Sequence, residues 1–180
     1  MILAIDIGRT FIKFGLVDDD FKTSPQSKVS TPTTLDDFWL TLEHIVSYHK
    51  DIISGIAIAC PGEINSKHGL IFKGGLIPYL TAIPLGSRLT KTFQLPVRVI
   101  NDADAAALAE ARYGSLKDLD CGASLGFRYG CWFRTCLTKG LAITTIVHPI
   151  SASSKYPKHE SNLSTLLPVG IIYAWLSKPC

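Results

Sequence analysis

The chain has 180 residues, enough for one domain of ordinary size or for one lobe of a larger protein. Hydrophobic residues make up 47% of it and charged residues 18%, a balance that allows a packed core and excludes a chain that is disordered throughout. The formal net charge of +3 is too small to indicate a nucleic-acid or membrane partner.

The charges are unevenly distributed along the chain. Through Leu125 there are 12 Lys and Arg against 14 Asp and Glu, whereas from Gly126 onward there are six against one, Glu160. The two parts therefore differ in composition, and we expect a boundary near residue 125.

No segment predicts insertion into a membrane or secretion. The most apolar late stretch, residues 166–176, is about half of the ~20 residues that a bilayer requires. Met1 is followed by an apolar run that contains Asp6, without the basic region of a signal peptide. The five cysteines show no spacing typical of a disulfide framework or a zinc site. We expect a cytoplasmic protein with reduced thiols and no structural metal.

The predicted elements alternate between strands and helices. Residues 1–8 and 11–17 indicate two strands joined by the turn Gly8-Arg9-Thr10. A helix is predicted from the cap Thr34 to about residue 48, and the alanine-rich stretch 103–113 has high helix propensity. Further expectations are strands at 28–31, 53–60, 97–100 and 121–125, an extended segment at 68–76 and a helix at 85–93. This order predicts an α/β fold with a mixed sheet and flanking helices.

The turn between the first two predicted strands carries residues suited to binding phosphate. A glycine turn lets backbone N–H groups and the Thr10 hydroxyl approach phosphate oxygens, and Asp6 can hold a magnesium ion or its water. The alternative interpretation is a plain hairpin turn capped by an aspartate.

Asn101 and Asp102 follow a predicted buried strand and precede a predicted helix. Ligands bind at this edge of open α/β sheets. A carboxylate there can accept a proton from a substrate hydroxyl, and the neighbouring amide can hold another hydroxyl. The alternative is that Asp102 or Asp104 only caps the following helix.

Together with Pro61-Gly62 and the Gly-Gly-Leu-Ile-Pro loop at residues 74–78, these motifs resemble the ROK family (repressors, open reading frames and sugar kinases). The resemblance covers about residues 1–125 and depends on four motifs in family order. It implies the N-terminal lobe of a ribonuclease H-like, actin-like ATPase fold. It also implies an intact, homodimeric protein that binds ATP, Mg²⁺ and a sugar between two lobes.

The resemblance assigns roles to individual residues. Asp102 is implied as the catalytic base and as a contact of the sugar. The other implied ligands are Asp6, Gly8, Arg9 and Thr10 for ATP, and Gly75 and Asn101 for the sugar.

Two residues depart from the family pattern. Arg9 replaces the second glycine of the usual Asp-Ile-Gly-Gly-Thr; its side chain restricts the turn or, alternatively, contacts phosphate. Leu76 stands where the family's sugar-pocket loop often has asparagine, so the resemblance does not indicate which sugar is bound. The DNA-binding helices of the family's repressors do not precede the first strand. We therefore favour a kinase of a hexose or amino sugar over a sugar-binding regulatory protein.

The resemblance ends after Leu125, where the family continues with a second phosphate loop of the type Leu-Val-Leu-Gly-Thr-Gly-Val-Gly. Codons read one base later can encode this loop immediately after Ser124. The last two bases of the Trp132 codon followed by the first base of the Phe133 codon, for example, can encode only glycine. We infer a one-base frameshift near Leu125, with a divergent but genuine segment as the alternative.

Residues 1–125 are thus expected to form the lobe, and residues 126–180 an atypical tail that is no recognisable domain. The tail shows no sustained helical or alternating pattern, so we expect it to be loosely docked and to be cut first by proteases between Gly126 and Lys158. Without the second phosphate loop, the chain as given would be a truncated and inactive form of the kinase.

Overall fold

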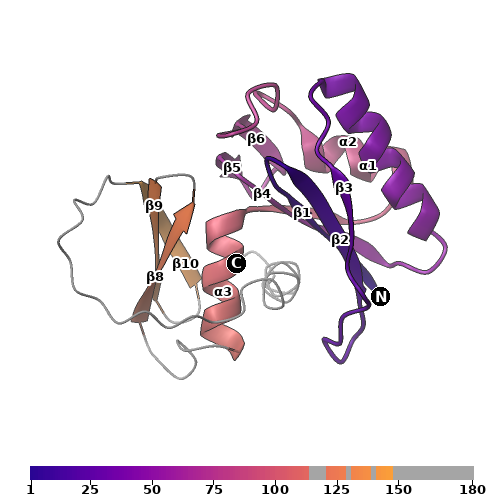
Figure 1. The fold of residues 1–180 in the computed structure, drawn as a ribbon. Helices are drawn as coiled ribbons and strands as arrows, with labels where there is room; N and C mark the ends of the chain where they lie inside the picture. Colours follow the sequence, from indigo (N-terminus) through magenta and orange to yellow (C-terminus); the bar gives the residue numbers. More distant parts are fainter. Residues whose placement is uncertain (114–120, 129–130, 139–140, 148–180) are drawn as a thin grey trace.

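The main sheet has five strands in the spatial order β3-β2-β1-β4-β7 (Figure 1). The computed structural model describes residues 1–113, 121–128, 131–138 and 141–147. β1 pairs antiparallel with β2 and parallel with β4, and β4 pairs parallel with β7, so the predicted mixed sheet is confirmed. The strands are β1 (Ile2–Ile7), β2 (Phe11–Val17), β3 (Ser27–Ser30), β4 (Gly55–Cys60) and β7 (Val97–Asn101).

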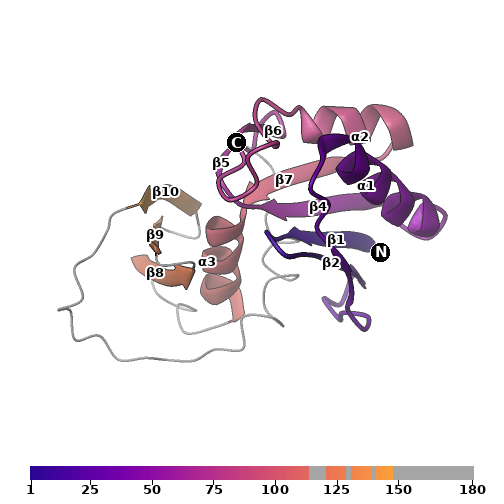
Figure 2. The ribbon, with the colours of Figure 1, turned by 45° about the horizontal axis from the view of Figure 1, so that its top comes forward.

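Helices cover both faces of this sheet (Figure 2). Alternate side chains of a strand point to opposite faces. Leu3 and Ile5 are therefore buried in the larger core with α1 and α2, and Ile2 and Ala4 lie in a smaller core with Ala105 of α3. The helices are α1 (Leu35–His49), α2 (Leu85–Phe93) and α3 (Asp102–Tyr113), close to where the sequence predicts them.

Local contacts fix α1 and hold α2 beside it. Thr34 Oγ1 accepts a hydrogen bond from the backbone N–H of Asp37 at 3.2 Å, and the Asp37 carboxylate lies in the first turn, where the helix dipole favours negative charge. The guanidinium of Arg88, on α2, lies 3.7 Å from the ring centroid of Trp39 and 3.2 Å from Glu43 Oε1.

A small hairpin of β5 (Glu63–Asn65) and β6 (Leu70–Lys73) lies against β7. The sequence predicts only one extended segment here, because the three residues of β5 are too few to show a pattern. The backbone N–H and C=O groups of Ile71 bond to those of Ile83 at 2.9 and 3.0 Å, which joins β6 to the segment before α2.

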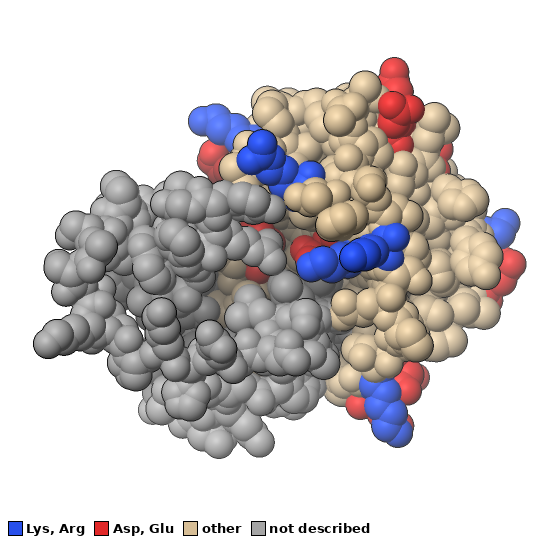
Figure 3. Space-filling model, in the orientation of Figure 1, with Lys and Arg blue, Asp and Glu red and all other residues tan. Residues whose placement is uncertain are grey.

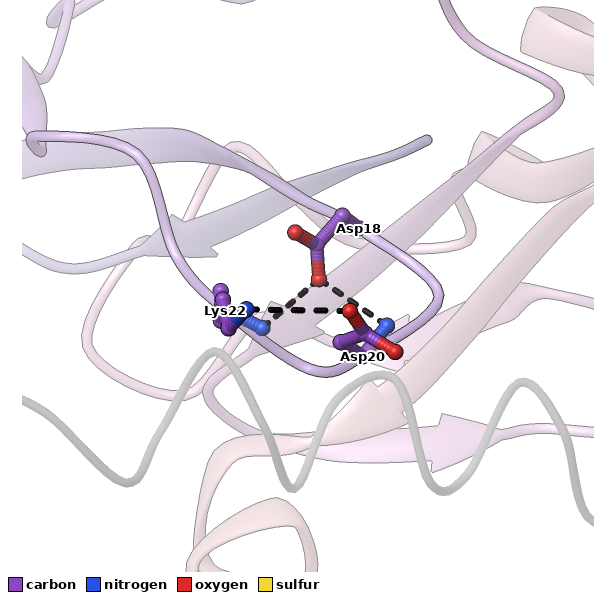
Figure 4. A network of polar contacts seen from close by, with 3 residues as sticks. All are labelled: Asp18, Asp20 and Lys22. Carbon is purple, nitrogen blue, oxygen red and sulfur yellow. Dashed lines mark hydrogen bonds and ion pairs between the residues drawn. The ribbon is translucent and has the colours of Figure 1, made fainter.

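The connection from β2 to β3 is organised by Asp18 (Figure 4). Asp18 Oδ1 accepts hydrogen bonds from the backbone N–H groups of Asp20 at 3.0 Å and Lys22 at 2.8 Å. Lys22 Nζ lies 3.7 Å from Asp20 Oδ2, and both side chains are 78% exposed, so this ion pair contributes little to stability. The acidic run at 18–20 is therefore explained by the geometry of a turn.

Three further strands lie between residues 121 and 147. An antiparallel sheet in the order β10-β9-β8 follows α3, and α3 lies between it and the main sheet (Figures 1 and 2). Its strands are β8 (Cys121–Arg128), β9 (Cys131–Thr138) and β10 (Leu141–Val147).

The pattern of residues after 125 does not by itself predict β9 and β10, because it lacks sustained alternation. Residues 131–147 are rich in Thr, Ile and aromatic residues, which favour strands even without alternation. The remainder of the expected cleavage region, residues 129–130, 139–140 and 148–158, lies outside the described residues.

On the face shown in Figure 3, the charged side chains of the described residues form a few small groups on a largely uncharged surface. Most of these groups contain both signs, so the described part of this face has no broad basic area of the kind that binds nucleic acid. None of the helices described here is long and apolar enough to cross a membrane.

The packing of α1 predicts how much stability is lost when one large side chain is removed from the larger core. Phe38 is fully buried, and its ring makes edge contacts with Trp39 at 5.8 Å and Tyr79 at 5.9 Å. Phe38→Ala should lower the free energy of unfolding by roughly 3–5 kcal/mol, as measured by urea denaturation. Leu40→Ala on the same helix, at a side chain 65% exposed, should change it by less than about 0.5 kcal/mol. Equal losses in the two variants would show that α1 does not pack as described.

Candidate active site

The carboxyl ends of three parallel strands meet at one edge of the main sheet. Asp6 lies at the end of β1, Cys60 ends β4 and Asn101 ends β7. The pairing places Asp6 opposite Ala59 and Cys60 opposite Asn101. Because β4 lies between β1 and β7, the predicted phosphate turn and the predicted sugar residues flank the same strand.

Cys60 is buried at this edge, and the charges of two carboxylates, Asp102 and Asp6, act on its thiol. Burial raises the pKa of Cys60, and the negative charges of Asp102 and then of Asp6 raise it further. The thiol therefore stays protonated at neutral pH. The combined effect also shows that the structure brings Asp6 and Asp102 into one electrostatic environment.

The side chain of Asn101 connects three elements. Its Nδ2 donates a hydrogen bond to the carbonyl oxygen of Gly62 at 2.7 Å, in the loop that follows β4. Its Oδ1 accepts hydrogen bonds from the backbone N–H groups of Ala103 at 2.8 Å and Asp104 at 3.3 Å, at the start of α3. Asn101 is thus the N-cap of α3 and an anchor of the preceding loop.

Gly62 packs directly against the loop that carries Gly75. Both residues have positive φ, 105° at Gly62 and 57° at Gly75, a region that other residues rarely adopt. A Cβ on Gly75 would lie 3.2 Å from the Cα of Gly62, and one on Gly62 would overlap the Lys73 carbonyl oxygen. The structure therefore brings Gly75, Gly62 and Asn101 into one contiguous group.

Asp102 is the first residue of α3 and is half-buried. Its Oδ1 accepts a hydrogen bond from the backbone N–H of Ala103 at 2.9 Å, a donor that it shares with Asn101. The cap of α3 is therefore supplied by Asn101, not by Asp102 or Asp104 alone. The carboxylate lies at the N-terminus of α3, where the helix dipole interacts favourably with a negative charge.

Asp6 is a buried carboxylate on the strand next to β4. Only 9% of the residue is exposed, and its Oδ2 lies 3.7 Å from Nζ of Lys13 on β2. Lys13 is directly opposite Asp6 in the antiparallel pairing of β1 with β2. The lysine offsets part of the cost of burying the negative charge.

The turn from β1 to β2 is compact. The backbone N–H of Gly8 donates to the Phe11 carbonyl oxygen at 3.0 Å, and a Cβ on Gly8 would lie 2.9 Å from that oxygen. Arg9 and Thr10 are exposed. Arg9 does not have positive φ, so the turn itself does not require the glycine that the family usually has there.

The sequence motifs do not indicate two residues that organise this region, Lys13 and Tyr79. Lys13 follows from the register of the predicted hairpin, which places residue 13 opposite residue 6. The hydroxyl of Tyr79 donates to the Pro32 carbonyl oxygen at 2.6 Å and so ties the loop after Gly75 to the segment before α1. No local pattern signals this contact, because its partners are 47 residues apart.

The oxygen ligands at this edge suit magnesium bound together with a nucleotide. No three His, Cys, Asp or Glu side chains among the described residues are grouped so as to hold a metal by themselves. Mg²⁺ is commonly held by one or two carboxylates together with substrate phosphates. Asp6 is a carboxylate of this kind, and the close turn at Gly8 lies beside it.

Known proteins match the chain in sequence and in fold. A β-glucoside kinase of Listeria monocytogenes is 34% identical over 121 residues, which are 66% of this chain and 40% of that protein. A ROK family protein from Streptococcus pneumoniae, solved in complex with sucrose, has a TM-score of 0.69 and 30% identity, covering 79% of this chain and 47% of the other. A glucokinase from Streptomyces griseus, in complex with glucose and AMPPNP, shares the fold with a TM-score of 0.69 and 23% identity, covering 81% and 46%.

The lobe described above is thus the N-terminal lobe of an actin-like ATPase fold. Solved structures with this fold include a transcriptional regulator as well as kinases. The chain spans about 40% of the length of the curated β-glucoside kinases that it matches. The match to the ROK family extends over residues 2–123, and the chain belongs to that family.

Proposed function

We propose that the intact protein is an ATP-dependent kinase that phosphorylates a hydroxyl group of a hexose or an amino sugar. The observation that carries this proposal is the position of Asp102. It stands at the start of α3, next to an asparagine whose amide is tied to the glycine loop after β4. The kinase activity of the β-glucoside kinase relative, and the glucose and AMPPNP bound by the glucokinase, support it.

Three residues act on the sugar in this proposal. Asp102 accepts the proton of the attacking hydroxyl as its oxygen bonds to the γ-phosphorus of ATP, and ADP leaves. Asn101 retains hydrogen-bonding capacity at its amide and holds a second hydroxyl. Gly75 lines the sugar, because its backbone reaches the edge through its contact with Gly62.

The turn from β1 to β2 acts on the nucleotide. Gly8 allows close approach of the backbone, and Thr10 and Arg9 are the exposed side chains of the turn. Asp6 would hold Mg²⁺, which when bound neutralises charge on the phosphates. Lys13 forms an ion pair with Asp6, with 3.7 Å between Nζ and Oδ2, and helps to hold the carboxylate in place.

We further propose that the chain as given carries one half of this site, followed by an out-of-frame tail. The family match ends at residue 123, two residues before the change in composition at Leu125. β8 crosses this boundary and β9 and β10 follow it, but their sequence lacks the glycine-rich phosphate loop that the shifted frame can encode. Phosphoryl transfer depends on positioning by both lobes, so the 180-residue chain is expected to have no kinase activity.

A sugar-binding regulatory protein is the second candidate function. It would use the same sugar residues without phosphoryl transfer, and a transcriptional regulator of the family shares the fold. Sugar binding without turnover, in a protein whose frame is restored, would favour this candidate. A coupled assay of ADP formation over a panel of hexoses and amino sugars separates the two.

The role of Asp102 predicts the result of removing its carboxylate. In the frame-restored, full-length protein, Asp102→Ala should lower kcat by ~10²–10⁴, because the proton acceptor is lost, while sugar binding stays measurable. The readouts are the coupled assay and calorimetric titration with the sugar.

Asp104→Ala is the matched control, since it removes a carboxylate from the same turn of α3. It should leave kcat within about threefold, on the scale of a change outside the reacting groups. An Asp102→Ala variant that retains turnover within about tenfold of the parent would remove Asp102 from the role of general base.

The conformation of Arg9 predicts that this residue is tolerated in the turn. Arg9→Gly should leave the affinity for ATP within about threefold, because Arg9 has ordinary φ and its replacement relieves no strain. A nucleotide titration of the full-length protein measures this. A loss of about tenfold, recovered by Arg9→Lys, would show instead that the positive charge contacts phosphate.

A further inference from the structure

A pocket lies at the opposite end of β7 from Asn101. Its volume is about 310 Å³, and it is formed by the turn at residues 66–69 between β5 and β6, by α2 and by the start of β7. Arg98 lines it and precedes Asn101 by three residues, which corresponds to about 10 Å along a strand. None of the residues assigned above to ATP or the sugar lines this pocket.

Two glycines form the inner wall of the pocket. Gly69 has φ of 61°, and its carbonyl oxygen accepts a hydrogen bond from the backbone N–H of Gly86 at 2.9 Å. A Cβ on Gly69 would lie 2.8 Å from the Cα of Gly86, so a side chain there would separate the turn from α2. The absence of side chains lets the turn approach α2 closely and leaves the space above the two backbones open.

The rim of the pocket is basic. Lys67, Lys91 and Arg98 line it from the turn, from α2 and from β7, together with His68, and no acidic residue is among the lining residues. All four are exposed. Within the part of the chain that the structure describes, the three cations form no ion pair with a carboxylate, unlike Lys13, Lys22 and Arg88.

Hydroxyl groups add hydrogen-bond donors to this positive rim. Ser66 lies on the turn and Thr90 lies on α2, and both line the pocket. The hydroxyl of Ser87, also in the lining, donates to the Pro84 carbonyl oxygen at 3.2 Å. Three cations around a few hydroxyl groups are the partners that phosphate oxygens require. The volume is at the lower end of the range for pockets that bind small molecules, so it suits a compact anion and not a polymer.

We propose that this pocket binds a small molecule that carries a phosphate or pyrophosphate group. The ligand lies against the backbones of Gly69 and Gly86, with its phosphate oxygens toward Lys91 and Arg98. This proposal concerns binding alone and is independent of the kinase activity proposed above.

Calorimetric titration of the full 180-residue chain tests the proposal with two phosphorylated probes. Sodium pyrophosphate and glucose 6-phosphate are titrated separately, with sodium sulfate and glucose as references. We expect at least one phosphorylated probe to bind more tightly than both references, and its affinity to fall as salt is raised. The double variant K91Q/R98Q should weaken this binding roughly tenfold, because two charged contacts are lost.

Lys50→Gln is the matched control, because it removes one positive charge at an exposed site at the end of α1. It should leave the affinity within about twofold. Three results would overturn the proposal: binding that Lys50→Gln weakens as much as K91Q/R98Q, sulfate binding as tight as that of the tighter-binding phosphorylated probe, or no binding of either probe.

A second measurement needs no variant. In proton NMR of the unaltered chain, the ring protons of His68, which lines the pocket, should shift on addition of the bound probe. Those of His44, an exposed residue of α1 outside the pocket, should not. Equal shifts of the two histidines would indicate nonspecific association and contradict the assignment.

Discussion

The side-chain amide of Asn101 is the contact on which the whole functional edge depends. Its nitrogen donates a hydrogen bond to the carbonyl oxygen of Gly62, in the loop after β4, and its oxygen accepts hydrogen bonds from two backbone N–H groups in the first turn of α3. One side chain thus joins the end of β7 to a loop and to a helix. Each hydrogen bond of this kind contributes on the order of 1 kcal/mol, but together they also fix where three backbones lie.

The position of Asp102, the proposed catalytic base, follows from that junction. Because Asn101 caps α3, the next residue, Asp102, is held at the start of the helix and at the end of the parallel strands. Because Asn101 also holds Gly62, the loop with Gly75 is brought to the same edge. The remaining carboxylate, Asp6, reaches it from β1, on the other side of β4.

Much of this arrangement could be predicted from sequence, for reasons that are local. A few consecutive residues are enough to indicate the apolar strands β1 and β4, the cap at Thr34 and the alanine-rich α3. The rule that ligands bind at the carboxyl ends of parallel strands then places Asp6 and Asp102 at one edge of the sheet. The motif order within residues 1–125 was sufficient to indicate the family.

The rest depends on contacts between distant residues. Asn101 and Gly62 are 39 positions apart, and Tyr79 and Pro32 are 47 apart, so no window of sequence reveals either contact. The basic pocket likewise forms only when a turn, a helix and a strand meet. Strands β9 and β10 were missed for a different reason: the prediction required alternation, whereas their composition alone favours strands.

In the proposed function a nucleotide lies between two lobes, and the chain as given is proposed to carry one of them. The proposed loss of frame near Leu125 explains this together with the acid-poor composition that follows. The nucleotide sequence of the gene across codons 120–140 tests it most directly. The proposal predicts that the frame read one base later encodes Leu-Val-Leu-Gly-Thr-Gly-Val-Gly after Ser124 and stays open well beyond it. A stop codon in that frame, or a sequence without the glycine-rich loop, would contradict it.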